Sequence, residues 1–245
     1  MIVRVRSLLF GFLWLIFCAN GLAASEINWD MEAFEPDLTN IPSLQNGFKV
    51  YVNYCLGCHS LKYQRYERTA DDLMIPHDLL ESRLIFANQK KGDLMTTAMD
   101  PIKAKSWFGA PPPDLTMVTR ARDPEWVYNY LKTFYVDDTR PFGVNNKVFE
   151  NVGMPNVLKE LQGVQRLDCG AEVRDCRELI VDDGTGAYTD TEFESVIYDL
   201  TNFLHYVGDP SQEERRSIGV WVLAFLAFLG IFTYFLNREY WKDVH

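Results

Sequence analysis

Cysteine and histidine, the usual protein ligands of zinc and of iron, are scarce in this chain, which has five cysteines and four histidines among 245 residues. Cys55 and Cys58 stand close together, but no second ligand pair follows at the spacing of a zinc knuckle, which excludes a site of that class. Basic residues are also in deficit, since 24 lysines and arginines face 34 aspartates and glutamates. The formal net charge of −10 argues against a nucleic-acid partner.

Long apolar runs without charge occur at only two places, and each predicts a segment outside the main domain. Residues 1–24 have the basic start, apolar run and small-residue end of a signal peptide. Residues 218–236 hold no charge and would form a helix about 28 Å long, which suits a membrane span. The sequence therefore predicts a periplasmic domain over 25–212, a transmembrane helix over 218–236 and a cytoplasmic tail over 237–245.

The segment Cys55-Leu56-Gly57-Cys58-His59 has the attachment signature of a c-type haem. Each thiol can add to one porphyrin vinyl group, and His59 then becomes the proximal ligand of the iron. A thioredoxin-like redox pair would start a helix after a strand, whereas a helix-like segment precedes this motif. A plain disulfide would leave the adjacent histidine without a role. We therefore expect one covalently bound haem c.

A second side chain can occupy the sixth position on the iron. The candidates are His77, His205, His245 and the six methionines of the exported chain. Met154 is the strongest, because Gly153 and Pro155 mark an irregular backbone that can present a thioether. Histidine and methionine together raise the reduction potential, and a haem with both positions filled transfers electrons without bond chemistry.

A stiff strap runs from Trp107 to Leu115 and contains three consecutive prolines. These prolines, Pro112 and Pro113 among them, fix φ and remove backbone donors, so the strap cannot join a helix or a central strand. Such a strap can hold a flat apolar cofactor. The apolar residues that flank the prolines, including Trp107 and Phe108, predict that the strap is packed against the domain.

Burying two haem propionates requires positive partners. Arg120 and Arg122 follow the strap. Arginine suits this role because its planar guanidinium can donate two parallel hydrogen bonds to one carboxylate. The sequence pattern does not show which of the two arginines would pair with a propionate.

Apolar periodicity predicts three helices within the domain. The first covers 43–54 and leads into the haem motif. The second begins with Asp123 as its N-cap. The third opens with a capping box of Thr191 and Glu194. We expect the third helix to cross the first at Gly47, where the missing side chain gives room.

Acidic residues and two further cysteines gather in the last third of the domain. Residues 168–214 hold 13 acidic side chains against two basic ones. These charges are either a solvated surface or a field that steers a cationic partner, and the sequence leaves both interpretations open. Cys169 and Cys176 remain after the haem pair, and an oxidising compartment favours a disulfide between them over two buried thiols.

These motifs, in this order, make the chain resemble the cytochrome c1 family, the haem subunit of the bacterial quinol–cytochrome c oxidoreductase (the cytochrome b–c1 complex). The resemblance covers about residue 43 to the end of the chain. It rests on the Cys55–His59 motif, Ala110–Leu115 with Arg120-Ala121-Arg122, Gly153-Met154-Pro155, Asp182-Asp183-Gly184-Thr185 and the single carboxy-terminal anchor.

The resemblance implies a mainly α fold, in which a c-type cytochrome domain with long loops precedes one C-terminal transmembrane helix. It also implies that His59 and Met154 are the axial ligands of the iron. Arg122 would lie at a propionate, with Tyr128 close by.

The resemblance further implies an electron-transfer subunit that is not catalytic alone. It would take an electron from a Rieske iron–sulfur subunit and pass it to a soluble or tethered c-type cytochrome, with cytochrome b as a second partner. Its haem domain would lie on the periplasmic side of the bacterial inner membrane. The alternative is a membrane-anchored c-type cytochrome that serves an oxidase or another respiratory chain. A haem enzyme such as a peroxidase needs an open iron site, which Met154 would close.

Overall fold

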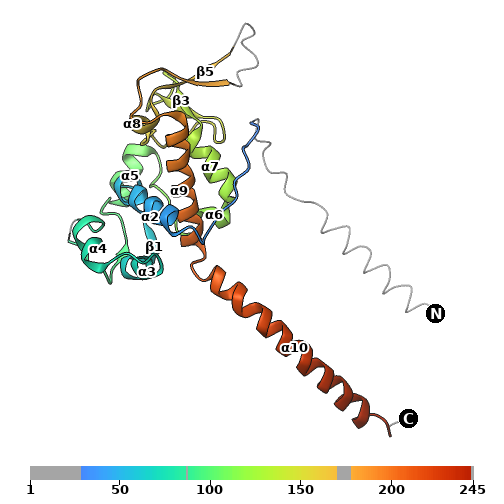
Figure 1. Ribbon diagram of the computed structural model, residues 1–245. Helices are drawn as coiled ribbons and strands as arrows, with labels where there is room; N and C mark the ends of the chain where they lie inside the picture. Colours follow the sequence, from blue (N-terminus) through green and yellow to red (C-terminus); the bar gives the residue numbers. More distant parts are fainter. Residues whose placement is uncertain (1–28, 87, 170–177, 244–245) are drawn as a thin grey trace.

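Two helices cross at the centre of the domain and contribute much of its core. In the computed structural model, which describes residues 29–86, 88–169 and 178–243, α2 (Ile41–Val50) packs across α9 (Asp190–Gly208). A third helix, α7 (Pro124–Lys132), also packs against α9 (Figure 1). The fold is mainly α with long connecting loops, as the sequence predicts.

The remaining elements are short, apart from the last helix. In chain order they are η1 (Tyr51–Cys55, a π-helix), β1 (Leu61–Arg65), α3 (Tyr66–Asp72), α4 (His77–Arg83), β2 (Leu94–Met95), α5 (Pro101–Phe108), α6 (Val118–Ala121), β3 (Phe134–Val136), β4 (Val144–Asn146), α8 (Lys159–Gln162), β5 (Gln165–Asp168), β6 (Glu178–Val181) and α10 (Gln212–Tyr240). The strands form three antiparallel pairs, β1 with β2, β3 with β4 and β5 with β6.

The crossing of α2 and α9 depends on Gly47. A Cβ at this position would lie 2.0 Å from the carbonyl oxygen of Asp199 and 2.6 Å from the Cβ of Phe203. Phe48 and Phe203 then stack beside the crossing, with ring centroids 5.3 Å apart. The predicted crossing at Gly47 is confirmed. The helix expected over 43–54 is confirmed as α2 followed directly by η1, which brings the chain to the haem motif.

The predicted N-terminal caps of α7 and α9 can be compared with those in the structure. Asp123 is the N-cap of α7, as predicted, although its side chain makes no capping hydrogen bond. The predicted capping box of α9 is wrong by two residues, because Thr189 and Glu192 form it. Both pairs fit the same pattern, and Glu194 instead binds the ammonium of Lys132 at 2.8 Å.

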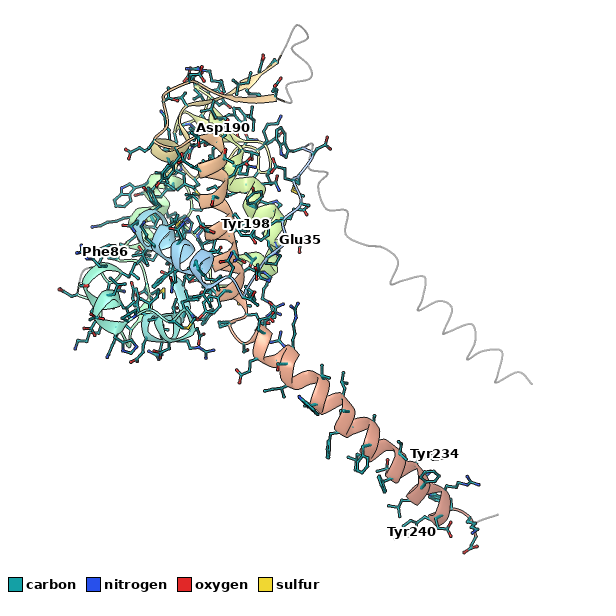
Figure 2. All side chains as sticks on the ribbon, in the orientation of Figure 1. Glu35, Phe86, Asp190, Tyr198, Tyr234 and Tyr240 are labelled. Carbon is teal, nitrogen blue, oxygen red and sulfur yellow. The ribbon has the colours of Figure 1, made fainter. Side chains whose placement is uncertain are left out.

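The amino-terminal segment over 29–40 has no helix or strand and is held by side chains of α7 and α9. Asn129 on α7 exchanges two hydrogen bonds with the backbone of Glu32, at 2.9 and 2.8 Å. Asn202 on α9 does the same with the backbone of Asp37, at 3.0 and 2.8 Å. Figure 2 shows Glu35 beside Tyr198, whose hydroxyl donates to the Glu35 carbonyl. The segment therefore ties α7 to α9.

The last helix, α10, extends away from the rest of the described chain (Figure 1). Its 29 residues contain the predicted span over 218–236, and none of them is buried. It is long and apolar enough to cross a membrane. Helical structure begins before the apolar run, at Gln212, so the charged residues 213–216 belong to the same helix.

Two predictions fall partly or wholly outside the described residues. The signal peptide predicted over 1–24 lies outside them. Cys169 is disulfide-bonded, and Cys176, its predicted partner, also lies outside them. Cys55 and Cys58 are both free thiols.

Substitution of Gly47 by alanine tests the helix crossing. The added methyl group would overlap the backbone of α9, so we expect Gly47→Ala to lower the free energy of unfolding by about 3 kcal/mol. Urea unfolding of the haem-loaded protein measures this loss. Gly92→Ala is the control, because no atom lies within 4 Å of the added Cβ. Equal stability of the two variants would contradict a close crossing.

Candidate functional site

A cavity of about 420 Å³ opens onto both the haem motif and the Met154 loop. Most of its lining side chains are apolar or aromatic, which is typical of cofactor sites. The lining comes from residues Tyr54, Cys55, Cys58, His59, Phe108, Ala110–Pro113, Leu115, Val118, Arg122, Trp126, Val127, Tyr130, Leu131, Phe149, Val152–Pro155, Val157, Leu200 and Leu204. Segments far apart in the sequence therefore meet at one site.

The haem motif follows directly from the π-helix η1. The wider turn shows in the hydrogen bond from the Leu56 amide to the Tyr51 carbonyl, at 3.0 Å and five residues apart. Such turns are frequent at functional sites. After it, the amides of Cys58 and His59 both donate to the Cys55 carbonyl, at 3.0 and 2.8 Å. This tight turn keeps both thiols and the imidazole on the cavity wall.

The orientation of the His59 ring is set by the strap. Its Nδ1 lies 2.7 Å from the carbonyl oxygen of Pro113, and since a carbonyl only accepts, Nδ1 carries the proton. Nε2 is then the free nitrogen, as a metal-binding histidine requires. Burial lowers the pKa of His59, against the opposing effects of the Pro113 carbonyl and Asp114, and so favours the neutral ring.

The proline strap is fixed to the haem motif by three contacts. Besides the His59–Pro113 bond, the Leu115 amide donates to the Ser60 carbonyl at 2.9 Å. The Asp114 carboxylate accepts from the Lys62 amide at 2.8 Å. Residues 111–115 form no helix or strand, as predicted, but Trp107 and Phe108, the first two residues of the expected strap, belong to α5.

The two aromatic residues before the prolines, Trp107 and Phe108, differ in their position relative to the cavity. Phe108 lines the cavity, whereas the Trp107 side chain is 57% exposed. The expectation that Trp107 is packed is therefore wrong. It occupies the last turn of α5, and its ring only meets the edge of Phe108, 6.4 Å away.

Met154 lies in an irregular loop, as predicted from its glycine and proline neighbours. Of the six methionines in the described chain, it alone lines the cavity. The buried Asn146 shapes this loop, because its Oδ1 accepts from the amides of Val148 and Phe149 at 2.9 and 3.0 Å. Nothing in the sequence pattern singles out Asn146 for this role.

The two candidate arginines occupy different environments. Arg122 lines the cavity with its guanidinium 5.2 Å from the Trp126 ring centroid, and it makes no ion pair within the described residues. Arg120 does not line the cavity and lies 3.6 Å from the Asp209 carboxylate. Arg122 is therefore the better placed partner for a propionate.

Tyr128, expected near a propionate, does not line the cavity. Its ring lies 5.3 Å from that of Phe34 and 4.9 Å from the Lys132 ammonium. The reason is its position on α7, where the residues that face the cavity are Trp126, Val127, Tyr130 and Leu131. Pro112 and Pro113 do line it, together with the haem motif and Met154.

These residues fit a covalently attached haem. Two free thiols stand three positions apart, and the adjacent imidazole has Nε2 available. Burial raises the pKa of the Cys55 thiol to about 12, with a smaller contribution from Cys58, as expected for sulfur on an apolar wall. One thioether and one unpaired guanidinium complete the set that axial ligation and a propionate require.

Comparison with known proteins gives a consistent result. Residues 83–244 match the model of the Cytochrome C1 family. The chain is 48% identical to a cytochrome c1 of Allochromatium vinosum over 95% of this chain and 97% of that one. It is 25% identical to a cytochrome c1 of Rhodobacter capsulatus over 81% and 82% of the two chains.

The chain is also similar to two other proteins. The chain is 39% identical to a protein named ammonia monooxygenase gamma subunit of Nitrosomonas europaea, over 98% of this chain and 99% of that one. A chain of a solved hyperthermophilic respiratory complex III covers all of this chain at 14% identity, with a TM-score of 0.44.

Replacement of Met154 tests the sixth ligand. Met154→Leu should keep the haem covalently attached but lose the methionine–iron absorption band. The reduction potential should fall by a sizeable part of the roughly 0.8 V range that axial ligands span, because a neutral thioether favours ferrous iron. Redox titration and absorption spectroscopy measure both effects. Met99→Leu, outside the cavity, should change neither, and survival of the band in Met154→Leu would assign the ligand elsewhere.

Proposed function

Because the chain belongs to the cytochrome c1 family, we propose that it passes electrons from a Rieske iron–sulfur subunit to a periplasmic c-type cytochrome within a quinol–cytochrome c oxidoreductase. It carries one covalently bound haem c, as its family does. The observation that carries the proposal is the single cavity that brings the Cys55–His59 motif together with Met154.

The chain's own residues suit electron transfer better than bond chemistry. Haem c, when bound, supplies one-electron exchange between ferric and ferrous iron. His59 and Met154 would both bind the haem iron, which would leave no open site for a peroxide or another substrate. The thioether would favour the ferrous state, and Arg122 would balance the charge of a propionate.

The position of α10 supports a membrane-bound subunit. It follows α9 after three residues, so the haem domain is held directly at the start of the anchor. We propose that this domain lies on the periplasmic side, in keeping with the predicted signal peptide, and that 237–245 face the cytoplasm. Cytochrome b would then supply the surrounding helices.

Exposed acidic residues lie at the end of the domain farthest from α10. The β5–β6 pair and the start of α9 form this end, while α10 follows the other end of α9 (Figure 1). Glu178, Asp183 and Asp190 are exposed here. Some other acidic residues in the described part of 168–214 have structural partners, such as Asp199 with Ser43 at 2.6 Å. We propose that the exposed group steers a soluble cationic acceptor.

Co-purification tests the complex. The tagged full-length chain should bring a cytochrome b and a Rieske protein with it from gently solubilised membranes, with membranes from the untagged strain as control. Recovery of an oxidase or a monooxygenase without these two subunits would favour the alternative, a membrane-anchored cytochrome that serves another chain.

Salt dependence tests the acidic end. The rate of electron transfer to a soluble acceptor should fall steeply with salt, because screening shortens the reach of charge from about 10 Å at 0.1 M to about 3 Å at 1 M. Glu178→Lys with Asp183→Lys should lower the second-order rate constant and flatten its salt dependence. Asp78→Lys on α4 is the control for a charge reversal elsewhere. A rate independent of salt would leave these charges with a role in solubility alone.

A further inference from the structure

The hydroxyl of Tyr130 contacts the sulfur of Met154 inside the cavity. The two atoms are 3.4 Å apart, and since a thioether only accepts, the hydroxyl is the donor. This is the hydroxyl's one hydrogen bond within the described residues. A thioether sulfur has two lone pairs, so it can bind a metal with one and accept this hydrogen bond with the other.

The Tyr130 ring is held on two sides, which fixes where its hydroxyl points. Trp126, one turn earlier on α7, stacks on it with centroids 5.0 Å apart and planes 10° apart. Phe134 meets it edge to face, at 5.1 Å and 73°. The guanidinium of Arg122 covers the Trp126 ring in turn.

The backbone of Tyr130 is also bound to the loop that carries Met154. The Asn146 amide donates to the Tyr130 carbonyl at 2.7 Å. The same side chain accepts from two amides of that loop, those of Val148 and Phe149. One buried asparagine therefore holds α7 and the Met154 loop in a fixed relation.

We propose that Tyr130 is a positioning residue for the sixth ligand, whose hydroxyl holds the Met154 sulfur toward the iron and raises the reduction potential. This inference rests on the proposed role of Met154 as a ligand. A hydrogen bond to sulfur withdraws electron density from it, and a less basic ligand stabilises ferric iron less. The positive end of the hydroxyl dipole also faces the site, which favours the extra electron of the ferrous state.

Removal of the hydroxyl alone tests the proposal. In Tyr130→Phe the ring contacts remain, the haem should stay attached, and the midpoint potential should fall below that of the wild-type protein. The methionine–iron band should persist with a changed position or intensity. Redox titration and absorption spectroscopy of the full-length, haem-loaded protein measure both.

Tyr66→Phe is the matched control. Tyr66 is fully buried, its hydroxyl donates to Gln89 at 2.8 Å, and it does not line the cavity. It should lose a similar amount of stability without any change in potential or band. If Tyr130→Phe also leaves potential and band at their wild-type values, the hydroxyl is a packing group and the proposal is wrong.

Two further results complete the test. Proton NMR of the reduced wild-type protein should place the Tyr130 hydroxyl proton close to the Met154 methyl protons. If Tyr130→Phe fails to fold, this measurement on the wild-type protein tests the proposal in its place. Absence of that proximity overturns the proposal. A wild-type protein without a methionine–iron band would instead refute the ligation by Met154, which separates that failure from a failure of the Tyr130 hydrogen bond.

Discussion

The close approach of α2 and α9 at Gly47 is the contact on which the site depends. The α9 backbone occupies the space where any side chain at Gly47 would lie, so the two helices can come this close only at a glycine. One helix leads through η1 into Cys55, and the other places Leu200 and Leu204 on the cavity wall. The haem motif is thus positioned by a backbone contact outside the cavity.

Polar side chains hold the other walls in place. The Lys132 ammonium binds the carboxylates of Glu32 and Glu194 at 2.7 and 2.8 Å, which joins the amino-terminal segment, α7 and α9. Asn129 and Asn202 repeat this connection with amide groups. None of the residues that make these contacts lines the cavity. They stabilise a wall whose inner face is apolar and makes few directional contacts of its own.

One face of α7 carries a continuous series of contacts toward the candidate sixth ligand. Arg122 covers Trp126, Trp126 stacks on Tyr130, and the Tyr130 hydroxyl reaches the sulfur of Met154. The proline strap, another part of the cavity wall, orients His59 through the Pro113 carbonyl. Each candidate axial ligand therefore has its own supporting group, and the two groups come from different segments of the chain.

Local patterns in the sequence determined the attachment motif, the stiff strap, the irregular loop at Met154, the apolar final helix and the glycine at the helix crossing. The first four depend on residues close together in the chain, where spacing and backbone chemistry suffice, whereas the contact of Gly47 with Asp199 and Phe203 forms only in the tertiary structure. The sequence placed the α9 capping box two residues late because two overlapping pairs fit the same pattern, and in the structure Glu194 binds Lys132 instead. Nor could it separate Arg122 from Arg120, place Tyr128 outside the cavity, or reveal the bonds of Tyr130 and Asn146. Those outcomes depend on which face of a helix meets a distant segment, and only the tertiary structure decides that.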